Sequence, residues 1–165
     1  MKKILSVVLA TMLLLSLTAS AFAATGLGSF TAVKVTAATA EKAGTVQVNT
    51  TMCAVELDAE GKIVSISFDV AQSKAGFDAT GAVVGEASFE VATKLEKKEG
   101  YNMKAASPIG KEYYEQMAAF EAWCIGKTVE EVLTLSADDA DLKAGCTVTI
   151  TDHLAALEKA AANAK

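Results

Sequence analysis

A short segment of strictly alternating residues sets the fold class of this chain. Between residues 64 and 70, apolar side chains occupy every second position, with serine or aspartate between them: Val64, Ile66, Phe68 and Val70. This period of two predicts a strand with one buried face. The largely β-branched residues 45–57 precede it, and Asp58-Ala59-Glu60-Gly61 is typical of a turn, so we expect a hairpin.

The rest of the predicted sheet is less regular. We expect a first strand at residues 30–36 and another around Phe89, Val91 and Thr93. The apolar parity of the second strand changes between Val48 and Cys53, which predicts a β-bulge at residues 49–52. Residues 71–86 show no period, as in a long surface connection, and the charged residues 94–100 are expected to form a solvated turn.

A helix is predicted over residues 108–124, because apolar side chains recur there at spacings of three and four: Ile109, Tyr113, Met117, Phe120 and Cys124. Ser107 as the N-cap and Pro108 as the first helical residue mark its start, and Gly126 marks its end. Thr128 and Glu131 form a capping box ahead of a short second helix.

The last section of the chain predicts a β-branched stretch at residues 147–151 and then an alanine-rich helix. Leu154, Leu157 and Ala161 share one side of that helix, Thr151 or Asp152 would cap it, and His153 is expected to face solvent. The predicted fold class is therefore α+β: an antiparallel sheet covered by the long helix of residues 108–124 and by the C-terminal helix.

The first 23 residues have the form of an export signal. Lys2 and Lys3 precede an apolar run over residues 4–17, and Ala21-Phe22-Ala23 has the small-x-small pattern that signal peptidase cuts. The run is shorter than the roughly 20 residues that a transmembrane helix needs. We therefore expect a bacterial signal peptide, cleavage after Ala23, a secreted or extracytoplasmic protein with no transmembrane segment after cleavage, and one domain at residues 24–165.

Charge and cysteine content exclude several kinds of partner. Residues 24–165 carry 20 acidic residues against 13 lysines, a net charge of −7, so nucleic acid is not an expected partner. The sequence holds no arginine, so a bound phosphate must use backbone N–H groups, lysine or a covalent bond. Cys53, Cys124 and Cys146 allow at most one internal disulfide, of undetermined pairing, and their spacing matches no zinc site.

One nine-residue motif carries a specific chemical signal: Asp141-Leu142-Lys143-Ala144-Gly145-Cys146-Thr147-Val148-Thr149. It resembles the signature of FMN-binding domains, in which Asp-x-x-Ser-Gly-Ala-Thr-x-Thr leads into a C-terminal helix. The aspartate, the glycine and both threonines match at the family's spacing, whereas Ala144 and Cys146 replace the serine and the alanine. The resemblance implies FMN as the cofactor, with Thr147 in the role of the threonine that a transferase joins to the FMN phosphate.

The resemblance implies further cofactor-binding residues. Asp141 and Gly145 would shape the phosphate loop, and Lys143 would add a positive charge. The start of the last helix would offer N–H groups and the positive end of the helix dipole to the phosphate. The side chains of residues 101–104 are candidates to line the flat ring. Without a flavin, Asp141 and Thr147 are ordinary turn and strand residues, and residues 101–104 form a helix-entry loop.

Two functions follow from these observations. The first is an exported FMN-binding protein that exchanges electrons with an extracytoplasmic redox partner, and so a redox carrier rather than a stand-alone enzyme. The second is a secreted binding or structural module of the same fold with no bound flavin, which the changes at Ala144 and Cys146 favour. These changes leave covalent attachment at Thr147 and loss of the flavin as alternatives. A hydrolase is disfavoured, because His153 has no nucleophile motif to serve.

Overall fold

A computed structural model of the chain describes residues 24–85, 92–135 and 139–165, and it has the expected α+β fold. Its antiparallel sheet has the strand order β1-β2-β3-β4, where the strands are β1 (Ala24–Thr36), β2 (Gly44–Leu57), β3 (Ile63–Phe77) and the short β4 (Val83–Val84). The predicted signal peptide, residues 1–23, lies outside the described residues. Strand β1 includes the predicted first strand, residues 30–36.

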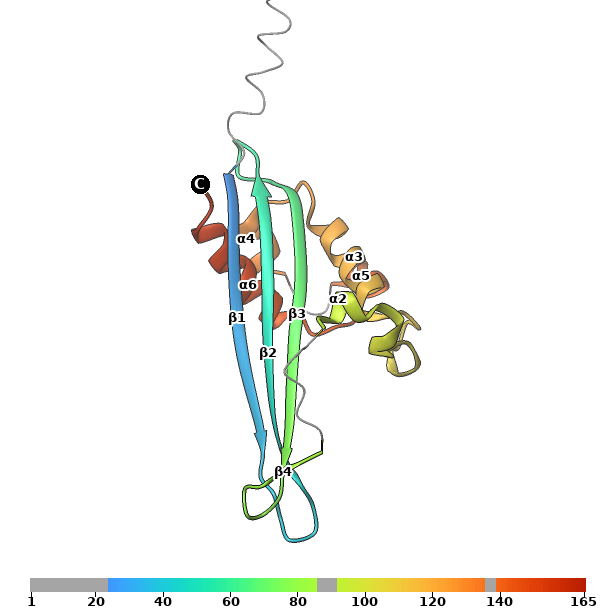
Figure 1. Cartoon of the computed structure of the whole chain (residues 1–165). Coiled ribbons are helices and arrows are strands. Elements are labelled where there is room, and N and C mark those ends of the chain that lie inside the picture. The colour runs from blue at the N-terminus through green and yellow to red at the C-terminus, as the bar shows by residue number, and fades with distance from the viewer. Residues whose placement is uncertain (1–23, 86–91, 136–138) are drawn as a thin grey trace, which may run out of the picture.

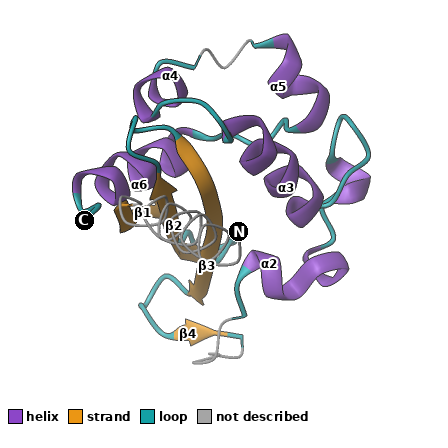
Figure 2. Cartoon of the chain, turned by 90° about the horizontal axis from the view of Figure 1, so that it is seen from above, coloured by secondary structure: helices purple, strands orange, loops and turns teal. Residues whose placement is uncertain are grey.

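The helices follow the sheet in the sequence: α2 (Lys94–Lys97), the 3-10 turns η1 (Lys98–Tyr101) and η2 (Lys104–Ala106), α3 (Tyr113–Cys124), α4 (Val129–Leu133), α5 (Ala140–Gly145) and α6 (Thr151–Ala162). Helices α3 to α6 lie on one side of the sheet, and α2 lies beside β3 (Figures 1 and 2). Phe120 of α3 stacks on Phe68 of β3, with 5.2 Å between the ring centroids. The sheet is thus covered by α3 and by the C-terminal helix, as predicted.

Helix α6 packs closely on β1 because β1 has glycines at the contact. A Cβ atom at Gly26 would overlap the carbonyl group of Ala160, and one at Gly28 would overlap the main chain of Ala156 and Ala160. The buried side of α6 consists of His153, Ala156, Leu157 and Ala160. This differs from the predicted stripe of Leu154, Leu157 and Ala161, because small residues are the ones that fit against the glycines.

Helix side chains cover the free edge of β1 next to this contact. The Lys159 Nζ donates a hydrogen bond to the carbonyl of Ser29 over 2.9 Å, and the Asn163 Nδ2 donates to the carbonyl of Leu27 over 3.0 Å. Unpaired strand edges otherwise invite pairing with other chains. These two bonds therefore protect the upper half of β1.

The two ends of the described chain meet at the same edge. The N–H of Thr25 donates to the carbonyl of Lys165 over 3.1 Å, and the N–H of Lys165 donates back to the carbonyl of Thr25 over 3.3 Å. The C-terminus thus adds one short bridge to β1.

The edge of β3 is covered by side chains as well. The N–H of Phe68 donates to the Glu121 carboxylate over 2.7 Å. One carboxylate oxygen of Asp69 accepts hydrogen bonds from the N–H groups of Val70, at 2.7 Å, and of Leu95 in α2, at 3.2 Å. A carboxylate of α3 (Glu121) thus binds the main chain of β3, and a carboxylate of β3 (Asp69) binds the main chain of α2.

The β-bulge predicted at residues 49–52 is absent. Strand β2 keeps an unbroken register with both neighbours there, and the register with β3 shifts between Glu56 and Leu57 instead. The apolar parity changes for another reason: Cys53 lies on the core face, whereas Val48 lies on the opposite face, across from Val33. The apolar side chains change face where the strands leave the helices.

Beyond the helices, β1 to β3 continue as a bare three-stranded ribbon (Figure 1). Residues 71–77 belong to this ribbon, so predicting them as a surface connection was wrong; their pairing with β2 overrides the small residues. On the core-side face of the ribbon, Asn49 accepts hydrogen bonds from the side-chain amides of Gln47 and Gln72, both at 3.1 Å. This polar ladder replaces the hydrophobic core.

Two predicted elements before α3 are also different. The strand around Phe89 and Val91 lies outside the described residues, and Thr93 is the N-cap of α2, where its hydroxyl accepts a hydrogen bond from the N–H of Glu96. The charged residues 94–100 form α2 and η1 rather than a turn. The capping box of Thr93 and Glu96 starts this short helix, and the charged run did not reveal it.

Helix α3 ends as predicted and begins later than predicted. Gly110 has a φ of 61°, outside the helical range, so the helix starts at Tyr113 with Glu112 as its N-cap and Glu115 completing a capping box. The helix ends at Cys124, before Gly126. Helix α4 begins after Thr128 with the predicted capping box.

The three cysteines are free and buried. Burial raises the pKa values of Cys53 and Cys124 to about 12, so both thiols remain protonated and unreactive at neutral pH. Within the described residues, no three metal-ligating side chains gather into a site. No helix of the described ranges has the length and hydropathy needed to cross a membrane.

Candidate functional site

A cavity of about 380 Å³ lies where the core gives way to the polar ladder of the ribbon. Asn49 and Thr51 of β2 and Val70 of β3 form its wall on the sheet side. The volume falls within the range of about 300–1,000 Å³ that is usual for small-molecule sites. Residues from both sheet and helices converge on it, so we take it as the candidate site.

Aromatic and cationic side chains form the second wall. Tyr101, Met103 and Tyr113 line the cavity, and the two tyrosine rings meet edge to face with 5.7 Å between their centroids. The Lys94 Nζ lies 5.1 Å from the Tyr101 ring centroid and 4.9 Å from that of Tyr113. The tyrosine faces thus hold a positive charge beside the cavity.

Glu112, which was not among the predicted site residues, positions this wall. Its buried carboxylate accepts hydrogen bonds from the N–H groups of Met103, at 2.8 Å, and Lys104, at 3.1 Å, while it also caps α3. Of residues 101–104, Tyr101 and Met103 line the cavity. The spacing of Glu112 and Glu115, which is that of a capping box, was the signal available in the sequence.

The third wall comes from the start of α6 and the turn before it. Val148, Thr149, Asp152 and His153 line the cavity. The β-branched residues 147–150 form an irregular loop with a bend at Val148. The N-cap of α6 is Ile150 rather than the predicted Thr151 or Asp152, and its apolar side chain makes no hydrogen bond to the first helical turn. The N-terminus of α6 therefore opens toward the cavity without a side-chain cap.

His153 is buried, so the prediction that it faces solvent was wrong. Its exposed fraction is 4%, and its Nε2 lies 3.0 Å from the hydroxyl oxygen of Tyr113. Its ring packs edge-on against Phe68, with 5.5 Å between the centroids. Burial, aided by the nearby charge of Lys94, lowers the pKa of His153 to about 4. The imidazole is therefore neutral at pH 7.

The four cofactor-binding residues predicted from the motif lie outside this cavity: Asp141, Lys143, Gly145 and Thr147. Asp141 and Lys143 are exposed on α5. Gly145 lies against α3, where an added Cβ would come within 2.9 Å of the Cβ of Ala119. The missing side chain of Gly145 thus lets α5 pack closely against α3.

Thr147 is held by Gln116, a fully buried residue of α3. The Gln116 Oε1 accepts hydrogen bonds from the N–H of Thr147 at 2.8 Å and from its hydroxyl at 3.1 Å. The Gln116 Nε2 donates to the hydroxyl of Ser107 at 3.0 Å and to the carbonyl of Lys111 at 3.1 Å. One amide thus ties the motif turn to the segment before α3.

Replacing Gln116 by methionine is expected to lower the free energy of unfolding by about 2 kcal/mol, because the Thr147 N–H and the Lys111 carbonyl lose a buried partner. Urea denaturation measures the loss, and amide hydrogen exchange at Thr147 reports on the turn. Gln72→Met, which removes a single hydrogen bond in the ribbon, is the control and should cost less than about 1 kcal/mol. Equal costs would contradict the anchoring role.

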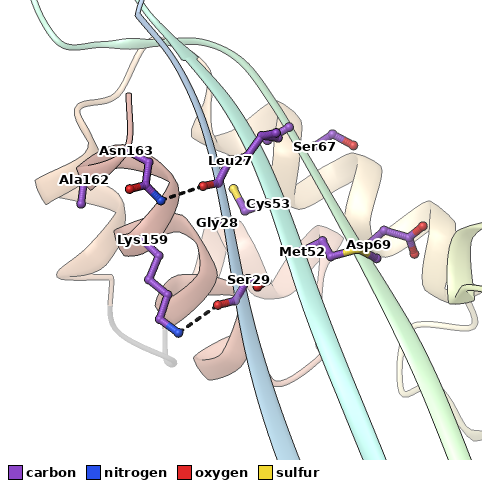
Figure 3. Close-up of a pocket in the computed structure, with 11 residues that line it drawn as sticks. Leu27, Gly28, Ser29, Met52, Cys53, Ser67, Asp69, Lys159, Ala162 and Asn163 are labelled. Atoms are coloured by element: carbon purple, nitrogen blue, oxygen red, sulfur yellow. Dashed lines mark hydrogen bonds between the residues drawn. The ribbon is translucent and has the colours of Figure 1, made fainter. Parts of the chain in front are cut away.

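A larger hollow of about 840 Å³ lies beside the upper half of β1 (Figure 3). Its polar groups are already in use: Lys159 and Asn163 bond to the edge of β1, and Asp69 bonds to main-chain N–H groups. Burial keeps the Cys53 thiol protonated. This hollow therefore offers a ligand fewer polar partners than the smaller cavity.

The described residues thus form an α+β domain with a cavity between sheet and helices. No protein-family model matches the chain, and no solved structure matches it significantly. Among curated proteins, it is similar to a chlorophenol reductase of Desulfitobacterium hafniense, with 36% identity over 95 residues. The match covers 51% of this chain, and the chain spans 29% of the reductase.

Proposed function

We propose that the chain is an exported FMN-binding protein that carries electrons outside the cytoplasm. The observation that supports this most is the position of the 380 Å³ cavity between two segments that the sequence singled out separately. Tyr101 and Met103 line it on one side, and Val148 and Thr149 of the motif line it on the other. Bound FMN would supply the redox chemistry, and the protein would hold and orient it.

The cavity residues suit the flat ring of a flavin. Tyr101 offers an aromatic face and Met103 a polarizable thioether, both of which pack well on conjugated rings. Lys94 adds a positive charge, which favours a ring that gains negative charge on reduction.

The phosphate is expected at the Thr147 end of the turn. The carboxylate of Asp152 lines the cavity and would repel a phosphate there, whereas the side chain of Thr147 is exposed. Lys143 and the start of α6 would supply positive potential, and Asp141 and Gly145 would shape the segment that carries Thr147. The Thr147 hydroxyl donates to Gln116, so its lone pairs remain able to accept a hydrogen bond, whereas an ester bond to the phosphate would replace the O–H and break the hydrogen bond to Gln116.

The comparison with the chlorophenol reductase agrees with a redox role. That protein is named for a reduction, and the chain shares 36% identity with it over 95 residues. Because the chain spans less than a third of the reductase, we propose a carrier or binding role rather than that enzyme's activity.

The test is the intact mass of the secreted protein, together with flavin fluorescence after denaturation. Expressed with its own first 23 residues in the cell type that makes it, the protein should begin at Ala24 and carry FMN. Thr147→Val should abolish a covalent adduct, because it removes the hydroxyl, and Thr147→Ser should keep it. Material that is colourless, has the bare polypeptide mass and does not bind added FMN would overturn the proposal.

The second candidate function is a secreted binding module without flavin. Ala144 and Cys146 depart from the motif, and the Cys146 side chain is buried in the core rather than presented at the turn. A bare mass with an intact fold would favour this function.

A further inference from the structure

Asn49 lies at the boundary between the cavity and the polar ladder of the ribbon. Its side chain is half-buried and lines the cavity, as do Thr51 and Val70, whereas its two ladder partners, Gln47 and Gln72, do not. Gln72 lies directly across from Asn49 on β3, and Gln47 lies two residues earlier on the same face of β2. The carboxamide of Asn49 therefore has other amides on one side and the cavity on the other.

The two glutamines fix the direction in which this carboxamide points. The Nε2 of Gln47 and the Nε2 of Gln72 both donate to the Oδ1 of Asn49, each over 3.1 Å. An amide oxygen has two lone pairs, so these donors fill it. Gln47 and Thr51 flank Asn49 on opposite sides along β2, and the oxygen is turned toward Gln47. The Nδ2, which leaves the same carbon in the other direction, is therefore turned toward Thr51 and the cavity.

The Nδ2 of Asn49 is unpaired and accessible. No described group accepts a hydrogen bond from it. In the described part of the chain, the one buried side-chain polar atom without a partner belongs to His153, so the Asn49 Nδ2 is not sealed off in the core. An acceptor on a ligand in the cavity can therefore reach this donor.

We propose that the NH₂ group of Asn49 selects planar ligands that carry a carbonyl oxygen or an unprotonated ring nitrogen on their edge. The aromatic wall that contains Tyr101 would contact the face of the ring, and Asn49 would donate to its edge. Gln47 and Gln72 are positioning residues, because they hold the Asn49 oxygen. The identification of the ring as an isoalloxazine rests on the proposed function, whereas the orientation of the carboxamide does not.

The orientation is tested in the ligand-free protein by ¹⁵N NMR of the side-chain amides. We expect the NH₂ protons of Asn49 to exchange rapidly with water, whereas one NH₂ proton of Gln47 and one of Gln72 exchange slowly, because these are the bonded donors. Asn163, whose Nδ2 donates to Leu27, is the reference for a bonded asparagine. Slow exchange at Asn49, as at Asn163, would show that the carboxamide is turned the other way and would overturn the proposal.

Ligand recognition is tested with Asn49→Asp, which keeps an oxygen for both glutamines and replaces the nitrogen donor by a second oxygen. FMN and lumiflavin, which has the flavin ring and no phosphate, should both bind this variant at least about tenfold more weakly, the effect of one lost hydrogen bond. Stability to urea should change little, because the ladder is kept. Asn102→Asp is the matched control: it adds the same charge at an exposed residue outside the cavity lining and should bind both flavins as the wild type does.

Binding is followed by the quenching of flavin fluorescence, and in the wild type the NH₂ resonances of Asn49 should move. If FMN binds but Asn49→Asp has no effect on its affinity and these resonances stay in place, this inference fails and the proposed function stands. If neither flavin binds, both are wrong.

Discussion

Replacing Gly28 by alanine is expected to lower the free energy of unfolding by about 3 kcal/mol, the upper part of the range for overpacked cores. The added Cβ would overlap the carbonyl oxygen of Ala156 and the amide nitrogen of Ala160, and would lie 2.9 Å from the Ala160 Cα. Main-chain atoms of a helix cannot rotate out of the way, so α6 must move off β1. Urea denaturation measures the loss.

Gly100→Ala is the control for this substitution. No atom lies within 4 Å of a Cβ at Gly100, so its stability should change by no more than about 0.5 kcal/mol. Since α6 also carries His153, Gly28→Ala should disturb the cavity as well, and amide exchange in the first turn of α6 should accelerate. A Gly28→Ala protein as stable as Gly100→Ala would show that α6 does not pack on β1 this closely.

The second large effect is a loss of stability in mild acid that depends on His153. Burial and the charge of Lys94 lower its pKa from 6.5 to about 4, so the unfolded chain binds a proton between these values that the folded chain rejects. The contribution of His153 to the free energy of unfolding is therefore fully present above pH 6.5 and is lost as the pH drops toward 4. The shift corresponds to about 3 kcal/mol.

The matched variant for this measurement is His153→Gln, which keeps a hydrogen-bonding side chain but does not titrate. Denaturation curves between pH 7 and pH 4 should show the wild type losing about 3 kcal/mol more than the variant over this range. Carboxylates contribute equally to both proteins, so the difference isolates the imidazole. Parallel pH dependences would mean that His153 is solvated in the folded state.

Local chemistry made part of the fold predictable. The capping box of Thr128 and Glu131 sets the start of α4, and the alternation of residues 64–70 sets the core face of β3. The alternation holds for Ile66, Phe68 and Val70, whereas Val64 is exposed and Ile63 is buried in its place. The correct signals lie within a few residues of the element that they define. Gly126 is another local signal: it follows the end of α3 with a φ of 80°, which is unfavourable for residues other than glycine.

The predictions were wrong where residues distant in the sequence determine the local structure. Ser107 and Pro108 are compatible with a helix start, but the carboxylate of Glu112 binds both the loop and the helix and moves the start to Tyr113. The face that α6 buries is chosen by glycines of β1 more than a hundred residues earlier, and this choice turns His153 inward.

The candidate site was predictable only in part. The predicted cofactor-binding residues lie outside the cavity: Asp141, Lys143, Gly145 and Thr147. Residues 101–104 and the motif were each recognised as candidates, and the structure brings Tyr101 and Met103 close to Val148 and Thr149. Their meeting depends on long-range packing of α3 and α6 on the sheet, which no local pattern encodes.

The bridge between Thr25 and Lys165 makes the domain nearly a closed ring. A short flexible linker could join these ends, and new ends could be opened in the turn at residues 58–62, with every strand pairing retained. The same geometry means that a host protein could accept the whole domain as an insertion, because both attachment points leave from one place.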